Sequence, residues 1–236
     1  MARRGRAGAR GGTARRWGLR LVALAVLFGL AFAAWLWWDM RSWRPDEARY
    51  PEQGALIPAG GAGVRFETLK AIGAQFVYLP LDGAGAGFAA DHARARAAGL
   101  KVGVVLAFDP CQPADTQSGA FAQMVPRDSG LLPAAIALAA LGDSCSPKVS
   151  DAAVESELMT LINQIEMHSG APVILKLAPA FQERHRTATT LARDLWLARD
   201  RALPDYAGRP WLLWSANSAL VSEAAEEPIE WVVVQK

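Results

Sequence analysis

The stretch "SDAAVESELMTLINQIEMHSGAPVILKLA" (residues 150–178) contains a helical pattern followed at once by a strand pattern. Ser150 is a candidate N-cap, and Gly170 ends the helical pattern. The apolar residues between them recur on one helical face: Val154, Leu158, Leu161, Ile162 and Ile165. The run "PVILKLA" (172–178) is short, apolar and begins with proline, which is typical of a buried strand. Helix and strand in succession indicate an α/β protein.

The same alternation extends over most of the chain. Four further runs have the length and composition of strands: "QFVYLPL" (75–81), "KVGVVLAF" (101–108), "PWLLWSA" (210–216) and "IEWVVV" (229–234). Helical patterns separate most of them, and no internal repeat is visible. The residues therefore predict a mainly parallel α/β sheet or barrel.

Charge is distributed unevenly along the 236 residues, although the net charge is only +2. Seven arginines precede the first acid, Asp39: Arg3, Arg4, Arg6, Arg10, Arg15, Arg16 and Arg20. The remaining chain has 25 − 7 = 18 Lys and Arg against 23 Asp and Glu, a balance of −5. Arginine and glycine beside an apolar span are what insertion topology requires, so we expect no nucleic-acid partner.

An apolar run, "LVALAVLFGLAFAAWLWW" (21–38), follows the arginines and carries no charge. Its length is close to the minimum for a membrane-spanning helix, and Trp35, Trp37 and Trp38 resemble an interfacial belt. We therefore predict a cytoplasmic arm (1–20), a signal anchor (21–38), a stalk (39–49) and a folded domain (50–236). Positive residues before the span place the N-terminus in the cytoplasm and the domain in the periplasm, at the inner membrane. The alternative is a cleaved signal peptide, because Ala31 and Ala33 have peptidase-like spacing.

The chain has two cysteines, Cys111 and Cys145, which fit an exported domain. In an oxidising compartment they can pair; the alternative is two unpaired buried thiols. His92, His168 and His185 stand alone in the sequence, and we expect them on helix surfaces. No Cys or His grouping has the spacing of a metal site, so we predict no metal.

From residue 50 onward the chain resembles glycoside hydrolase family 25, the lysozyme-type N-acetylmuramidases. "YPEQGALIPAGGAGVRFETLKAIGAQFVYL" (50–79) is similar to the opening of that family, and "AAGLKVGVVLAF" (97–108) to its A-G-L-x-x-G-x-Y-H-F strand. "VPRDSGLLPAAIALA" (125–139) resembles the segment that ends L-P-x-x-[LV]-D-[VL]-E. "PVILKLAPAF" (172–181), "DLWLARD" (194–200) and "WLLWSAN" (211–217) resemble later family elements in the same order. The resemblance implies an irregular (β/α) barrel without a cofactor.

The resemblance also implies that the catalytic acids are missing. The D-x-E of the family falls on Ala137 and Ala139, and its first-strand Asp falls on Leu56. Muramidase chemistry needs carboxyl groups on both sides of the glycosidic bond, and methyl groups cannot replace them. Other polar family positions fall on Val105, Leu106, Leu175, Ser215 and Ala216, which predicts an apolar cleft. In the barrel that the resemblance implies, Cys111 and Cys145 are neighbours at one mouth.

Two functional hypotheses follow. The first is a non-catalytic, membrane-anchored domain that binds peptidoglycan or a periplasmic protein. The second is a muramidase that uses displaced carboxylates, for which Asp82, Asp143 and Glu230 are the candidate acids. A shift of the alignment around residues 137–139 would make Asp143 the nearest acid, although Leu132-Pro133 and Cys145 would then be out of place.

Overall fold

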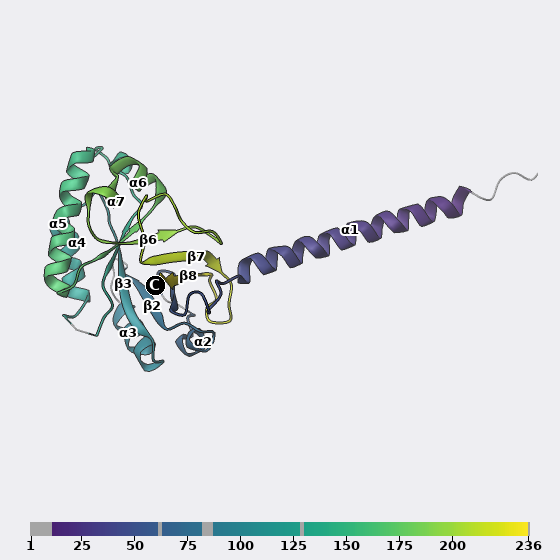
Figure 1. Ribbon diagram of the computed structural model, residues 1–236, viewed down its shortest axis with the longest axis horizontal. Helices are drawn as coiled ribbons and strands as arrows, with labels where there is room; N and C mark the ends of the chain where they lie inside the picture. Colours follow the sequence, from purple (N-terminus) through teal and green to yellow (C-terminus); the bar gives the residue numbers. More distant parts are fainter. Residues whose placement is uncertain (1–10, 61–62, 82–86, 128–129, 236) are drawn as a thin grey trace, which may run out of the picture. The chain divides into compact units, whose positions relative to one another are not determined.

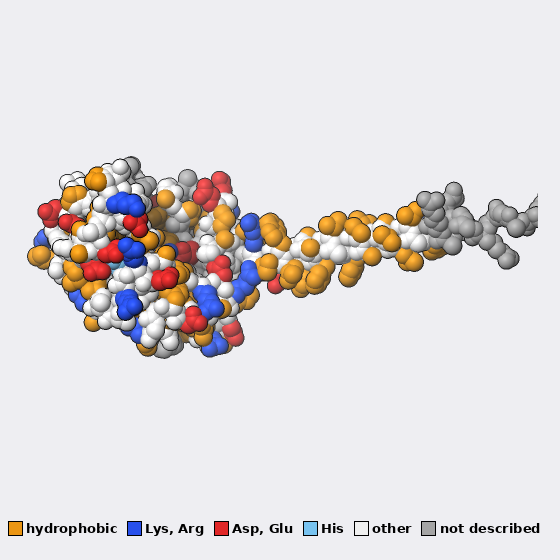
Figure 2. All heavy atoms as spheres, turned by 90° about the horizontal axis from the view of Figure 1, so that it is seen from above, with side chains coloured by type: hydrophobic (Ala, Val, Ile, Leu, Met, Phe, Trp, Pro, Cys, Tyr) orange, Lys and Arg blue, Asp and Glu red, His pale blue; other side chains and the backbone are white. Residues whose placement is uncertain are grey.

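The computed structural model describes residues 11–60, 63–81, 87–127 and 130–235, without the side chains of residues 11–16. They belong to two compact units, one ending at Ser42 and the other beginning at Trp43. The first unit contains the helix α1 (Gly11–Ser42). Its segment Trp17–Ser42 is long and apolar enough to cross a membrane, a test that a signal sequence near the N-terminus also passes. Figure 2 shows hydrophobic side chains along the visible side of this helix.

The second unit is a closed barrel of eight strands in sequence order (Figure 1). The strands are β1 (Gln53–Leu56), β2 (Phe76–Leu81), β3 (Lys101–Ala107), β4 (Ala135–Leu138), β5 (Ile174–Leu177), β6 (Asp194–Ala198), β7 (Leu213–Leu220) and β8 (Ile229–Val234). Strands β1 to β7 are parallel to their neighbours, whereas β8 is antiparallel to both β1 and β7. The predicted (β/α) barrel is confirmed, and its irregularity lies in β8.

Helices cover the outside of the barrel (Figure 1). They are α2 (Phe66–Ala71), α3 (Phe88–Ala97), α4 (Ala114–Met124), α5 (Asp151–Ser169), α6 (Pro179–His185) and α7 (Thr187–Thr190), with a short 3₁₀ helix, η1 (Gly142–Ser144). The helix predicted from the opening stretch is α5. The Ser150 side chain accepts a hydrogen bond from the Ala153 amide at 3.3 Å, and Gly170 ends the helix in the left-handed conformation.

Side chains alternate between the barrel interior and the layer under the helices, as the pleat of a strand requires. The interior cluster consists of Phe76, Tyr78, Val105, Ala135, Ile174, Trp196, Leu213 and Val232. Their immediate neighbours along the strands, such as Val77, Leu175 and Leu197, belong to the larger outer core. Both faces are apolar, which explains why the strand sequences are continuous apolar runs.

Two glycines make room for the aromatic rings in the interior. A Cβ atom on Gly103 would collide with the Tyr78 ring, and one on Gly54 would collide with Phe76. The Tyr78 ring in turn lies 4.9 Å from the Trp196 ring between centroids. These aromatic rings fill the middle of the barrel, which is therefore a packed core and not a pore.

The segment before β1 covers the outer face of β8, to which no helix is attached. The outward-facing Trp231 donates its Nε1–H to Gln53 Oε1 at 2.6 Å, and the Arg44 guanidinium lies 5.0 Å from the Trp231 ring centroid. Asn217 donates to the Trp43 carbonyl at 2.9 Å. Packing against the barrel thus begins at Trp43, inside the segment predicted as a stalk (39–49).

Candidate functional site

The carboxyl ends of β1 to β7 form one mouth of the barrel, where barrel enzymes carry their active sites. Glu230, near the start of the antiparallel β8, pairs with Leu56, the last residue of β1, and so lies at the same mouth. Leu56, Val105 and Ala137 all line the interior there. These three predicted positions therefore face the mouth, and each has an apolar side chain.

Ala137 and Ala139 are the positions on which the family D-x-E falls. Ala137 lines the interior, is partly buried and pairs in register with Lys176 of β5. Ala139 follows the last residue of β4, Leu138, and is exposed. A carboxyl group at Ala137 would stand beside the strand position that carries the Lys176 side chain.

A polar chain of four side chains occupies the mouth. Lys176 Nζ donates to Glu230 Oε2 at 2.8 Å, and these side chains are 19% and 16% exposed. The other carboxylate oxygen of Glu230 accepts from the Ser215 hydroxyl, which itself accepts from Trp196 Nε1 at 2.6 Å. Lys176 Nζ also lies 5.1 Å from the Trp196 ring centroid, within the range of a cation–π contact. Both oxygens of Glu230 therefore have protein partners.

Tyr206 closes one side of the same mouth. Its hydroxyl donates to the Leu177 carbonyl at 2.7 Å and accepts from the Ala198 amide at 3.0 Å, which joins the ends of β5 and β6. Burial raises the pKa of Tyr206, and the negative charge of Glu230 adds to this effect. The hydroxyl is thus protonated at neutral pH and acts as a donor.

The two described candidate acids for displaced catalysis, Asp143 and Glu230, belong to separate ion pairs. Asp82 lies outside the described residues. Asp143 is an exposed residue of η1, and its carboxylate lies 3.6 Å from Lys148 Nζ. Glu230 is in the ion pair with Lys176. The eight strands, all of them described, contain two acids, and the other one, Asp194, begins β6 at the opposite end of the barrel.

The predicted disulfide is present between Cys111 and Cys145, whose Cα atoms are 5.3 Å apart. Cys111 follows β3 and Cys145 follows η1 after β4, so the bridge joins two neighbouring loops at the mouth. Among the described residues, no group of three or more His, Cys, Asp or Glu is arranged to hold a metal ion.

Several predicted orientations are wrong. Leu106, Leu175 and Ala216 pack in the outer core under the helices, so they do not line the cleft. The cleft is also less apolar than predicted, because the inward residue of β5 is Lys176. That lysine was missed, although it is the one charged residue in "PVILKLA". His185 is buried on α6, not exposed on a helix surface.

Several solved structures have a fold similar to that of this barrel. A family 25 glycosyl hydrolase from Bacillus anthracis has a TM-score of 0.71 at 19% identity, covering 83% of this chain and 93% of its own. A lysozyme from Streptomyces coelicolor has a TM-score of 0.64 at 14% identity, covering 78% of this chain and 92% of its own. The spore cortex lytic enzyme SleM from Clostridium perfringens has a TM-score of 0.66 at 15% identity, covering 81% of this chain and 69% of its own.

The barrel has the fold of the family 25 lysozymes. This confirms the expected resemblance in architecture. No protein-family model matches the sequence, and no curated protein matches it. The family 25 fold therefore occurs here with a sequence that is only 14–19% identical to these solved structures.

Proposed function

We propose that this chain is a membrane-anchored, degenerate relative of the family 25 lysozymes that binds cell-wall glycan without hydrolysing it. The observation that carries the proposal is the set of side chains at the barrel mouth. Ala137 and Leu56 stand where the resemblance puts acids, and the one acid of the strands at that mouth, Glu230, is held by Lys176.

The chemistry of glycoside hydrolysis explains why this arrangement is unsuited to catalysis. One carboxyl group must protonate the leaving oxygen while a second acts as nucleophile or base, roughly 5–10 Å away depending on the mechanism. At the mouth the strands supply one carboxylate, that of Glu230, and both of its oxygens already accept hydrogen bonds. General acid catalysis alone commonly contributes about 10²–10⁴-fold, so its loss together with the partner carboxylate abolishes measurable turnover.

Binding is supported by the fold and by the polar groups that remain at the mouth. The solved proteins of this fold are described as lysozymes, muramidases and a spore cortex lytic enzyme. The Lys176 ammonium is partly exposed and has three donor hydrogens, of which one bonds Glu230, so it can also hydrogen-bond sugar hydroxyls and acetamido groups. In this proposal the mouth keeps part of a glycan-binding surface after losing the catalytic acids.

Hydrolysis and binding are tested separately on the full chain in lipid nanodiscs. We expect no release of muropeptides from purified peptidoglycan under conditions in which a family 25 lysozyme digests it. We also expect the nanodiscs to sediment with insoluble peptidoglycan, unlike protein-free nanodiscs and unlike a mixture with cellulose. Sedimentation equal to these controls would contradict the binding proposal.

Variants distinguish a displaced catalyst from lost chemistry. Muropeptide release that disappears in Glu230→Gln but persists in Asp143→Asn would overturn the non-catalytic proposal and identify Glu230 as the acid. The double change Ala137→Asp, Ala139→Glu is expected to remain inactive and to lower stability, because Lys176, the cation beside position 137, is already paired with Glu230 and a second carboxylate there competes for it. Activity of this double variant would show that the glycan subsites are intact.

A further inference from the structure

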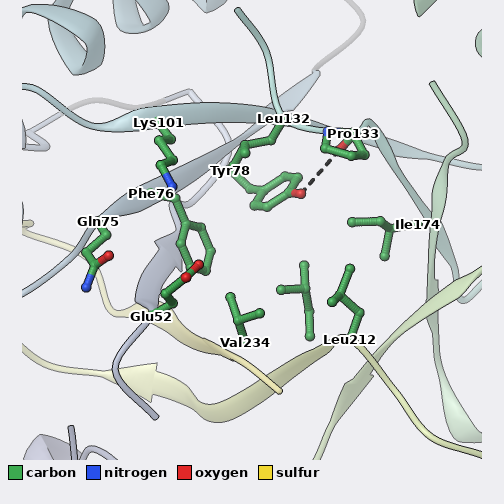
Figure 3. Close-up of a pocket in the computed structure, with 11 residues that line it drawn as sticks. Glu52, Gln75, Phe76, Tyr78, Lys101, Leu132, Pro133, Ile174, Leu212 and Val234 are labelled. Carbon is green, nitrogen blue, oxygen red and sulfur yellow. Dashed lines mark hydrogen bonds between the residues drawn. The ribbon is translucent and has the colours of Figure 1, made fainter. Parts of the chain in front are cut away.

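The barrel has a pocket at the end opposite to the mouth. Its lining comes from the amino ends of the parallel strands, including Phe76 of β2, Ile174 of β5 and Leu213 of β7, and from Val234 at the end of the antiparallel β8. The volume is about 170 Å³. No residue of the polar chain at the mouth lines this pocket, so it belongs to a separate site (Figure 3).

Rigid aromatic side chains form the inner wall of the pocket. Phe76 and Tyr78 pack edge to face with ring centroids 6.0 Å apart, and both are at most 4% exposed. The Tyr78 hydroxyl donates to the Pro133 carbonyl at 3.1 Å, which fixes the ring and satisfies its polar atom. Gly54 and Gly103 provide the space that these rings occupy. The pocket is therefore preformed.

The two sides of the pocket differ in chemistry. Leu132, Pro133, Ile174 and Leu212 form an apolar side, and Glu52, Gln75 and Lys101 stand together on the other side (Figure 3). The polar residues lie at the starts of three neighbouring strands, β1, β2 and β3.

The charged ends of Glu52 and Lys101 are available to a ligand. Both residues are exposed, and neither side chain forms a hydrogen bond or ion pair with another described residue. One anionic and one cationic group thus stand at the same side of an apolar pocket. A ligand that satisfies both must carry a cation and an anion close together, next to an apolar group.

Size limits the apolar group. An apolar protein cavity of about 150 Å³ binds benzene, so a pocket of 170 Å³ accepts a group of that size and not a long lipid chain. We propose that this pocket binds a small zwitterion with an apolar side chain, such as a free aromatic or branched amino acid. Its carboxylate pairs with Lys101, its ammonium pairs with Glu52, and its side chain lies against Leu212 and Ile174.

The test is methyl NMR on the full chain in nanodiscs, with isotope-labelled isoleucine. Three probes share the apolar group and differ in charge. Phenylalanine carries both charges, 3-phenylpropionate carries the anion alone, and phenethylamine carries the cation alone. We expect phenylalanine to shift the Ile174 methyl signal saturably without moving that of Ile162 on α5. The two single-charge analogues should bind about three- to tenfold more weakly, because each lacks one partly exposed ion pair.

Variants of the pocket complete the test. Leu212→Trp fills the pocket from its partly exposed edge and should abolish the Ile174 shift, whereas Leu203→Trp, at an exposed leucine outside the pocket, should leave it unchanged. Lys101→Met should weaken phenylalanine but not phenethylamine, and Glu52→Gln should weaken phenylalanine but not 3-phenylpropionate. No Ile174 shift with phenylalanine, or equal affinities for all three compounds, would overturn the proposal.

Discussion

Lys176 and Glu230 determine the chemistry of the barrel mouth at the scale of single residues. Their side chains meet at 2.8 Å across a site in which each is less than one-fifth exposed. Removing both ions from water is costly, and the pair offsets this cost only while both partners are present. The stability of the fold therefore depends on this ion pair at the barrel mouth.

We expect Lys176→Met to destabilise the fold by about 1–3 kcal/mol, because it leaves a poorly solvated carboxylate without its cation. The double variant Lys176→Met, Glu230→Gln should be more stable than Lys176→Met alone, since the glutamine can still accept from Ser215. Urea unfolding at neutral pH gives the four free energies of the double-mutant cycle. Strictly additive costs would show that the two side chains are not coupled.

The orientation of single residues was the part of the site least predictable from sequence. In "PVILKLA" both faces of the strand are buried, so the apolar pattern does not show whether Leu175 or its neighbours face inward. Lys176 was the available signal, because a long cationic side chain fits the barrel mouth better than the apolar layer under the helices. Ala137 and Leu56 were placed by the resemblance, and the strand register puts both at the mouth.

At the scale of elements, contacts between loops and strand ends hold the barrel together. Glu166, near the end of α5, forms a two-point ion pair with Arg193 at 2.5 and 2.8 Å and accepts from the Val173 amide at 3.0 Å. It thereby joins α5 to the segments that lead into β5 and β6. The hydrogen bonds from Arg193 are the main reason that the pKa of Glu166 is lowered.

Because the pKa of Glu166 is lower in the folded state, its stabilising effect is complete above the ordinary value of 4.5 and is lost as the pH falls through the lowered value. We expect Glu166→Gln to cost about 1–2 kcal/mol at neutral pH. The difference from the unsubstituted chain should shrink in acid. Unfolding curves at pH 7 and below pH 4 test this, and a constant difference would contradict the ionic role.

The disulfide joins the loop after β3 to the loop after β4 and encloses a sequence separation of 34 residues. Replacing both cysteines by serine should lower the unfolding free energy by about 3–4 kcal/mol, because the unfolded chain gains loop entropy. The urea midpoint should fall with little change in slope. A matched control is the unsubstituted chain with reductant, which should show a loss of similar size. No loss in either case would mean that the bridge is dispensable.

Element prediction succeeded where local signals were strong. Ser150 and Gly170 correctly bounded α5, and the β3 and β8 runs were located within one residue. Strands β1, β4 and β6 were located from the resemblance, because runs of four or five residues carry little periodicity. The packing of residues 43–52 on β8 could not be predicted from their own sequence, which is polar, broken by proline and typical of a stalk. Their position is explained by the outer face of β8, which no helix covers.

At the scale of the whole molecule, the two parts of the chain have opposite charge. The seven arginines before Asp39 make the N-terminal part positive, whereas the remaining chain has a balance of −5. In the topology that we propose, the arginine-rich arm stays in the cytoplasm and the barrel is exported, in agreement with an oxidised cysteine pair.

A reporter that works only outside the cytoplasm should be active when it is fused after Lys236. A reporter that works only in the cytoplasm should be inactive at the same position. The protein should also remain with membranes after a high-salt wash, because an apolar span is held by burial and not by charge. A matched control deletes residues 21–38. A soluble mature form beginning near Ala34 would instead identify the segment as a cleaved signal.

Helix α1 and the barrel unit follow each other directly along the chain. Helix α1 ends at Ser42 and the compact unit begins at Trp43. In the proposed topology, residues 39–42 add about 6 Å of helix between the apolar run and the barrel. So short a connection would keep the domain close to the bilayer surface. The domain would then search in two dimensions along the bilayer, and would meet only glycan that lies next to the membrane.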